Sequence, residues 1–190
     1  MPRLLMRLRR VPARVLHLLR RRQVRATLSG RVAPLSVLVV CHGNICRSPF
    51  GAAVLRRKLA GTNGGVRVES AGFIGPDRPC PAQAVAVAAR RGVDLSTHRS
   101  KLLGADLASS TDLILVMDPM QRRFVCDRFG RLPRDVVVLG DLDPLSAETR
   151  TIRDPVEQPR EVFEESYARI ERCVVELVNT VWGRPAAGSR

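Results

Sequence analysis

The sequence contains no apolar run of the roughly 18 residues that a membrane-spanning helix requires. Its five cysteines form an odd, scattered set, which is a poor disulfide framework and favours a reducing, cytoplasmic environment. No Cys-x-x-Cys pair occurs and the three histidines lie far apart, so neither a metal site nor a cofactor is predicted. With 45% hydrophobic and 26% charged residues, the composition is that of a globular protein with a substantial core.

Acidic residues are absent from residues 1–40, which contain ten arginines. The rest of the chain has 22 basic and 18 acidic residues, a net charge of only +4. The formal charge of +14 therefore arises largely from an N-terminal extension. Because the remaining body is only mildly basic and carries no recognition motif, no nucleic-acid partner is expected.

The extension, residues 1–34, lacks the continuous apolar core and small-residue cleavage site of a secretory signal. Its apolar residues recur at helical spacing, and arginines follow the same period, although Pro12 would strain such a helix. These apolar residues are Leu4, Leu8, Val11, Val15 and Leu18. Three interpretations stay open: an amphipathic helix that contacts anionic membranes, a disordered tail, or translation from an upstream start codon. In each case we expect residues 1–32 to be dispensable for chemistry.

The body, residues 35–184, is expected to form one domain, followed by a tail at residues 185–190. Short apolar runs predict strands, and longer amphipathic patterns between them predict helices. The predicted strands are Val37–Val40, Val66–Val68, Leu113–Val116 and Val136–Leu139. The predicted helices are Pro49–Leu59, Ala82–Arg91, Pro119–Phe129 and Val162–Trp182. Strands that alternate with helices predict an α/β fold, a parallel sheet with helices on both faces.

The segment from Cys41 to Ser48 lies between a predicted strand and a predicted helix, the layout of a phosphate-binding loop. Gly43 permits a positive φ angle that points consecutive N–H groups inward, and Asn44 tolerates one better than most residues. The chain between Cys41 and Arg47 is long enough to surround a tetrahedral oxyanion. The planar guanidinium of Arg47 would then grip two of its oxygens.

A cysteine attacks phosphorus as its thiolate, a form that a helix N-terminus and nearby donors favour. Ser48 is placed to donate to the Cys41 sulfur and to assist its departure later. The reaction also needs a carboxyl group that protonates the leaving oxygen and then activates water. Two Asp-Pro pairs, Asp143-Pro144 and Asp154-Pro155, are equal candidates from the residues alone.

The loop Cys-His-Gly-Asn-Ile-Cys-Arg-Ser-Pro, which begins at Cys41, resembles the signature of the low-molecular-weight protein-tyrosine-phosphatase family. Further segments resemble that family in order and spacing over about residues 36–180. They begin at Ser70, Asp94, Leu113 and Leu139, and the last ends at Asp154-Pro155. The resemblance implies a flavodoxin-like four-stranded parallel sheet and a cysteinyl-phosphate intermediate. It also implies phosphomonoesterase activity on phosphoprotein or small phosphate esters.

The resemblance assigns roles residue by residue. It makes Asp154, rather than Asp143, the general acid. Ser70 and His98 would hold Asn44 in its strained conformation, and Cys46 would form a reversible disulfide with Cys41 that protects it from over-oxidation. The phosphate would be bound by His42, Gly43, Asn44, Ile45, Cys46, Arg47 and Ser48.

The sequence departs from the family around the expected substrate pocket. Val156 and Glu157 follow the second Asp-Pro pair where an aromatic residue is usual, and only Phe73 stands near the other expected aromatic position. The natural substrate and any preference for phosphotyrosine therefore stay open. Two alternatives also remain: an arsenate reductase, which would need a resolving cysteine pair, and a non-catalytic phosphate-binding module.

Overall fold

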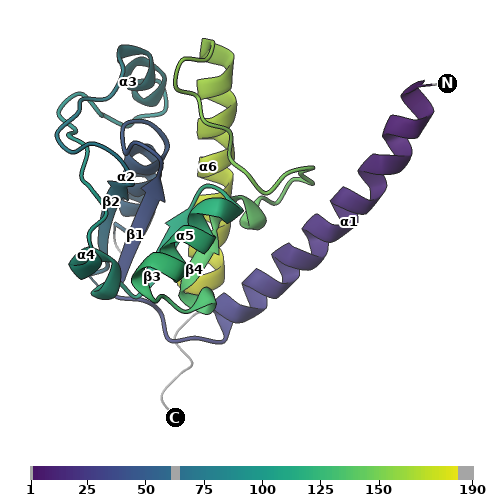
Figure 1. Cartoon of the computed structure of the whole chain (residues 1–190), viewed down its shortest axis with the longest axis horizontal. Coiled ribbons are helices and arrows are strands. Elements are labelled where there is room, and N and C mark those ends of the chain that lie inside the picture. The colour runs from purple at the N-terminus through teal and green to yellow at the C-terminus, as the bar shows by residue number, and fades with distance from the viewer. Residues whose placement is uncertain (1, 61–64, 184–190) are drawn as a thin grey trace.

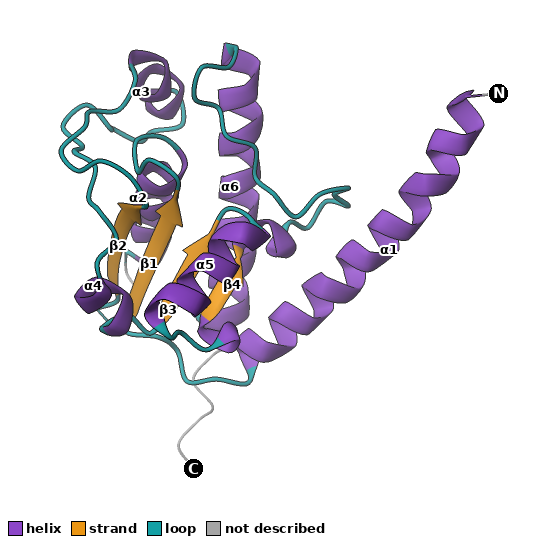
Figure 2. Cartoon of the chain, in the orientation of Figure 1, coloured by secondary structure: helices purple, strands orange, loops and turns teal. Residues whose placement is uncertain are grey.

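The computed structural model describes residues 2–60 and 65–183, with side chains from residue 13 onward. The predicted tail at residues 185–190 lies outside the described residues. Helices and strands alternate through the body, and a long helix precedes it (Figures 1 and 2). The elements are α1 (Pro2–Ser29), β1 (Ser36–Cys41), α2 (Arg47–Leu59), β2 (Arg67–Gly72), α3 (Ala82–Ala89), α4 (Ala105–Ser109), β3 (Leu113–Val116), α5 (Pro119–Phe129), η1 (Pro133–Asp135), β4 (Val136–Val138), η2 (Leu139–Leu142) and α6 (Arg160–Val181).

The four strands form one parallel sheet in the order β2-β1-β3-β4, which confirms the predicted fold class. Strand β1 lies inside the sheet and is buried along its whole length. In register, Cys41 at the end of β1 pairs with Gly72 at the end of β2. The last residue of β1 therefore emerges at the carboxyl edge of the sheet, where ligands of open α/β folds bind.

Helices cover both faces of the sheet, and alternate residues of β1 point into two separate cores. Val37 and Val39 face a core that includes residues of α2, α3 and α6. Leu38 and Val40 face a second core that includes residues of α4 and α5. Because both faces of β1 are buried, its sequence is a nearly continuous apolar run and does not alternate between apolar and polar residues.

Most predicted elements are present, with shifted boundaries. Helix α2 begins at Arg47 instead of Pro49, so the arginine belongs to the first turn of the helix. Strand β2 continues to Gly72, well beyond the predicted end at Val68, because its partner β1 supplies hydrogen bonds along the whole length. Helix α4 was not predicted, since its five residues are too few to show a helical period.

The N-terminal extension is helical from Pro2 to Ser29, and the helix continues through Pro12. Its final turns pack against the body beside β4 and α6, whereas its first half projects away from the body (Figure 1). His17 is fully buried and its Nε2 lies 2.9 Å from the carbonyl oxygen of Asp143. Leu28 is also buried, within the core that α2 and α6 share.

Ion pairs hold the same part of α1 to the body. Arg21 and Arg25 both contact Glu176 of α6, at 3.0 and 3.1 Å. Beyond the helix, Arg31 pairs with Asp135 at 3.1 Å. Removal of residues 1–32 would therefore uncover part of the core and leave Glu176 without these partners, whereas the expectation that they are dispensable for chemistry stays a prediction.

We predict that Leu28→Ala lowers the free energy of unfolding by about 2–4 kcal/mol, because it creates a cavity in a packed core. Leu19→Ala on the same helix is the control, since Leu19 is 59% exposed and should cost little. Denaturant unfolding of both variants measures the difference. Equal, small effects would show that α1 is not docked on the body in solution.

Candidate active site

The loop between β1 and α2 is shaped by one residue with a left-handed backbone. Asn44 has a φ of 52° and is completely buried. A non-glycine residue in this region costs roughly 1 kcal/mol, so neighbouring groups must hold it there. The loop ends where α2 begins, so the free N–H groups of the first helical turn border the same space.

Three hydrogen bonds hold Asn44. Its side-chain amide donates to the Ser48 hydroxyl at 2.8 Å, and its Oδ1 accepts from the Lys101 backbone N–H at 2.7 Å. The ring Nε2 of His98 lies 2.8 Å from the Asn44 carbonyl oxygen. The pKa of His98 is lowered, and burial of the ring is the main cause. The neutral form of the imidazole is therefore favoured. The imidazole consequently supports the loop by a hydrogen bond from a neutral N–H.

Ser70 is the other residue predicted to hold Asn44. It is buried in β2 and pairs in register with Val39, and no hydrogen bond joins its side chain to Asn44 among the described residues. The supporting role of Ser70 therefore stays a prediction, and the Lys101 backbone N–H is the group that donates to the Asn44 side chain. Lys101 was missed because a backbone N–H leaves no trace in the residue types.

Gly72, two residues beyond Ser70, is required by the closeness of the loop. A methyl group at this position would lie 2.8–2.9 Å from backbone atoms of His42, Gly43 and Asn44. The backbone N–H of Phe73 then donates to the His42 carbonyl at 2.8 Å. The end of β2 thus buttresses the loop through main-chain contact that leaves no room for a side chain.

Cys41 lies at the base of the loop and is almost fully buried. Its Sγ is 3.0 Å from the Ser48 hydroxyl, which also lies 3.3 Å from the carbonyl oxygen of Ala71. Since Asn44 donates to the same hydroxyl, the Ser48 proton is free to point at either the sulfur or that carbonyl. When Cys41 is a thiolate, donation to the sulfur is favoured because a charged acceptor binds more strongly.

Arg47 is nearly fully buried and spans the loop and the segment before α6. Its Nη1 donates to the Ile152 carbonyl at 3.0 Å, and its Nη2 forms an ion pair with Asp154. Its Nε is buried without a hydrogen-bond partner among the described residues. The guanidinium is thus held through both of its Nη atoms, and among the described residues its Nε N–H is left without an acceptor.

The two candidate acids have opposite surroundings. The Asp154 side chain is 41% exposed and lines the same cavity as Cys41 and Arg47. The Asp143 side chain is 2% exposed, and its oxygens contact Arg169 and Arg172 at 3.0–3.1 Å. Asp143 therefore joins α6 to the preceding loop as a structural ion pair, whereas Asp154 is the carboxylate that can reach a substrate.

Cys46 occupies the N-cap position of α2 and is buried against the aromatic side chains of the core. Burial is the main reason that the pKa of its thiol is raised far above the ordinary value, with nearby Cys41 adding to the effect. Tyr167 donates to the Cys46 carbonyl at 3.3 Å and stacks on Phe50 with ring centroids 3.9 Å apart. Cys46 is consequently a neutral thiol in the same loop as Cys41.

The cavity above the loop has a volume of about 200 Å³. Besides loop residues, its walls are formed by Ile74, Arg78, Asp154 and Val156, with no aromatic side chain among its described lining residues. Phe73 does not replace a missing ring, because it packs edge-on against Phe124 at 5.0 Å. No group of side chains suited to holding a metal ion is found within residues 2–60 and 65–183.

Comparison with known proteins gives the same assignment as the geometry. Residues 36–184 match the family model described as low molecular weight phosphotyrosine protein phosphatase. The probable low molecular weight protein-tyrosine-phosphatase EpsP of Ralstonia nicotianae is 41% identical over 141 residues, 73% of this chain and 90% of that protein. The low molecular weight protein-tyrosine-phosphatase Etp of Escherichia coli K12 is 37% identical, over 74% of this chain and 90% of that protein.

Solved structures are similar as well. The crystal structure of the Erwinia amylovora tyrosine phosphatase AmsI is 32% identical, with a TM-score of 0.69 over 77% of this chain and 92% of that one. Vibrio vulnificus Wzb, solved with benzylphosphonate, is 31% identical, with a TM-score of 0.64 over 74% of this chain and 94% of that one.

A parallel α/β sheet with a cysteine-bearing loop at its carboxyl edge is the arrangement expected of a cysteine-dependent phosphatase. The chain belongs to the low molecular weight phosphotyrosine protein phosphatase family and is a protein-tyrosine-phosphatase by homology. The resemblance seen in the sequence is thereby confirmed. The family match begins at residue 36, so helix α1 precedes it.

We predict that Asp154→Asn lowers kcat by roughly 10²–10³, because it removes a proton donor that lines the cavity. Asp143→Asn is the matched variant. It should retain most of its kcat and lose stability, on the order of 3 kcal/mol, because two arginines lose a buried partner. Steady-state hydrolysis of an aryl phosphate and denaturant unfolding are measured for both variants. If Asp143→Asn lost kcat and Asp154→Asn kept it, Asp143 would be the general acid.

Proposed function

We propose that residues 35–184 form the catalytic domain and hydrolyse aryl phosphate esters through a phosphorylated Cys41. The observation that carries this proposal is that the Cys41 thiol, the Arg47 guanidinium and the Asp154 carboxyl group line one small cavity. The substrate phosphate would rest on the loop N–H groups of residues 42–48. Arg47, released from Asp154, would grip two of its oxygens.

In the first step the Cys41 thiolate attacks phosphorus, and an S–P bond forms as the bond to the leaving oxygen breaks. The protonated Asp154 gives its proton to that oxygen, so a neutral alcohol or phenol leaves. In the second step Asp154 takes a proton from water, which attacks phosphorus and breaks the S–P bond. Ser48, 3.0 Å from the sulfur, stabilises the departing thiolate by donating to it.

The walls of the cavity suit an aromatic leaving group. Ile45, Ile74 and Val156 provide apolar surface on which a phenyl ring can lie, although none of them is aromatic. The benzylphosphonate named in the solved Vibrio vulnificus structure is a ligand of that kind. We therefore propose phosphotyrosine in proteins or peptides as the substrate of this chain.

The direct test is hydrolysis of phosphotyrosine peptides and of an aryl phosphate by the wild type, Cys41→Ser and Arg47→Lys. Cys41→Ser should be inactive, below a thousandth of the wild-type kcat, yet still bind phosphate. Arg47→Lys should lose about 10²–10³ in kcat/KM, because an ammonium cannot make the two-point contact. A Cys41→Ser variant with more than about a tenth of the wild-type kcat would refute covalent catalysis.

We further propose that Cys46 protects Cys41 from irreversible oxidation. The two thiols share one loop and one core cluster, and both are buried and free. A sulfenic acid on Cys41 would condense with the Cys46 thiol, releasing water and forming a disulfide that thiols reduce.

Peroxide should therefore inactivate the wild type reversibly and Cys46→Ser irreversibly, with dithiothreitol as the reductant. Mass spectrometry of the oxidised wild type should find the peptide cross-link between the two cysteines. A sulfinic acid on Cys41 beside a free Cys46 would contradict the protective role.

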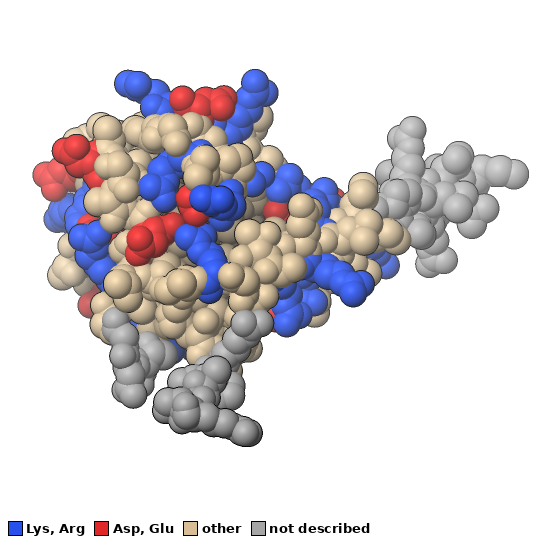
Figure 3. Space-filling view, turned by 90° about the horizontal axis from the view of Figure 1, so that it is seen from below, with Lys and Arg blue, Asp and Glu red and all other residues tan. Residues whose placement is uncertain are grey.

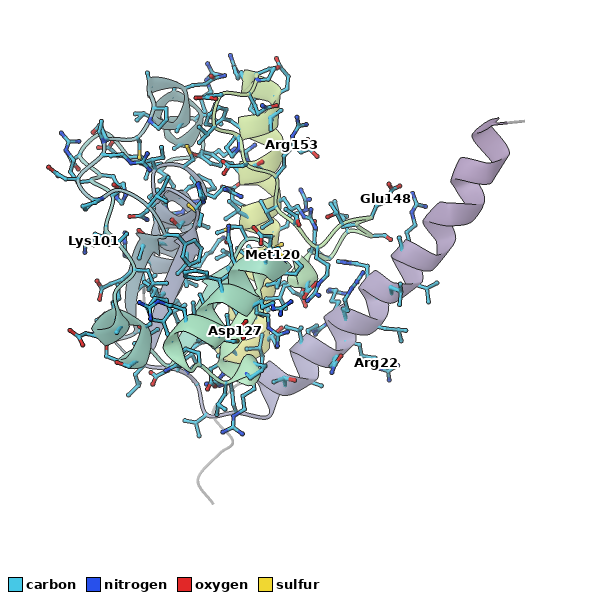
Figure 4. All side chains as sticks on the ribbon, in the orientation of Figure 1. Arg22, Lys101, Met120, Asp127, Glu148 and Arg153 are labelled. Atoms are coloured by element: carbon cyan, nitrogen blue, oxygen red, sulfur yellow. The ribbon has the colours of Figure 1, made fainter. Side chains whose placement is uncertain are left out.

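We also propose that helix α1 holds the enzyme reversibly on the cytoplasmic face of an anionic membrane. Val15, Leu16, Leu18 and Leu19 are each between 49% and 59% exposed, on the side of the helix that does not face the body. Arginines lie along the same projecting helix, with Arg22 directed away from the body (Figures 3 and 4). Each basic residue near such a surface contributes about 1 kcal/mol. Within the described residues no helix is apolar and long enough to cross a membrane.

The full-length protein should sediment with vesicles that contain phosphatidylserine, more at about 0.1 M than at about 1 M salt. A Leu16→Gln/Leu19→Gln double variant should lose most of this binding with hydrolysis unchanged. Leu132→Gln, at a 50% exposed position outside α1, is the control. Binding that survives in the double variant would contradict the proposal. The proposal would also be contradicted if the wild type formed dimers and the double variant did not. A second copy of the chain, and not a membrane, would then cover this face of α1.

A further inference from the structure

A second arginine, Arg78, lies at the wall of the catalytic cavity and has no part in the proposed chemistry. It follows β2 in a segment with two unusual backbone positions, Gly75 at a φ of 49° and Asp77 at 62°. The backbone N–H of Arg78 donates to the Ser100 hydroxyl at 2.9 Å, which in turn donates to the Gly75 carbonyl at 2.7 Å. The turn that carries Arg78 is therefore fixed by hydrogen bonds.

The side chain is fixed too. Arg78 Nη2 donates to the Gly43 carbonyl at 3.0 Å, so its guanidinium lies directly on the phosphate loop. A methyl group would lie 2.6 Å from Arg78 Nη2 at Gly43 and 3.0 Å from its Nε at Gly75, so the guanidinium occupies the space that a side chain at either glycine would take. The guanidinium thus packs on the backbone beside two glycines and donates to one of their carbonyl groups.

The charge of Arg78 is not compensated by any carboxylate. No ion pair to Arg78 occurs within the described residues, and its Nε is buried without a hydrogen-bond partner there. The one carboxylate of the cavity wall, Asp154, is engaged with Arg47. A half-buried cation without a counter-charge is costly, and an anion brought by a ligand would offset that cost.

We propose that Arg78 is a specificity residue that binds a second negative charge of the substrate, the carboxylate of an acidic side chain next to the phosphotyrosine. This inference rests on the proposed phosphotyrosine substrate. The phosphate already has Arg47 and the loop N–H groups, whereas Arg78 stands on the wall, where the peptide around the phosphorylated residue must pass. The exposed His42 lines the same cavity, and its imidazole adds no negative charge that would oppose such a contact.

The experiment measures kcat/KM for three phosphotyrosine peptides that differ only in the flanking residues, which are glutamate, glutamine or lysine. We compare the wild type, Arg78→Gln, Arg78→Lys and Arg99→Gln. Arg99 is the matched control because it is an exposed arginine close to Arg78. It pairs in a β-bridge with Pro79, the residue after Arg78, and it does not line the cavity. Para-nitrophenyl phosphate, which has no flanking residue, reports the chemistry alone.

The wild type should prefer the glutamate peptide over the glutamine peptide by about 5–10-fold, as for a charge-assisted contact. Arg78→Gln should abolish this preference, Arg78→Lys should keep part of it, and Arg99→Gln should keep it fully. Because Arg78 also donates to the Gly43 carbonyl, hydrolysis of para-nitrophenyl phosphate by Arg78→Gln reports any change in the loop, and the preference is taken as the ratio of kcat/KM for the glutamate and glutamine peptides within each variant.

Three outcomes would overturn the inference while leaving the phosphatase assignment intact. One is an equal preference in the wild type and Arg78→Gln, which would mean that Arg78 meets no substrate carboxylate. Another is an equal loss for all peptides and para-nitrophenyl phosphate, which is the signature of a role in loop structure or phosphate binding. The third is the same loss of preference in Arg99→Gln, which would show that the positive charge near the cavity attracts acidic peptides without a specific contact to Arg78. Failure of the proposed substrate differs from these, since every peptide would then be inert while para-nitrophenyl phosphate reacts.

Discussion

The strained backbone of Asn44 is the constraint on which the site depends. Its positive φ turns the loop so that Cys41 and Arg47 border one cavity, and the cost is offset by hydrogen bonds to Ser48, Lys101 and His98. Ser48 links the strained loop to the cysteine, since its hydroxyl accepts a hydrogen bond from Asn44 and contacts the Cys41 sulfur. The shape of the loop and the position of the nucleophile are therefore set by one connected network.

The electrostatics of the site follow from the same arrangement. Arg47 is buried, and its ion pair with Asp154 neutralises much of its charge until a phosphate arrives. Asp143, only eleven residues before Asp154, instead forms ion pairs with two arginines of α6. Two similar Asp-Pro turns thus have different surroundings, because Asp154 lines a cavity and Asp143 is buried in the protein interior.

The sequence could predict what is local. The strand before Cys41, the glycine and asparagine of the loop and the spacing to Arg47 all lie within one short segment, and the four-stranded sheet followed from its apolar runs. Contacts between distant segments could not be predicted, because they depend on how loops meet at the sheet edge. Lys101 binds Asn44 through its backbone, and Arg78 reaches the loop only across two glycines, so neither residue type signals its position. Helical spacing likewise revealed the amphipathic character of α1 but not which side would pack, and the buried side holds His17 and Leu28 while Leu19 is exposed.

The most direct test of the account is to identify the covalent intermediate. Wild-type enzyme is mixed with a radiolabelled aryl phosphate, quenched during turnover, digested, and mapped by mass spectrometry. The account predicts phosphate bound to the sulfur of Cys41, at a level that rises within the first turnover and falls when the substrate is exhausted. Turnover without protein-bound phosphate, or phosphate on Ser48 or Cys46 instead, would contradict it.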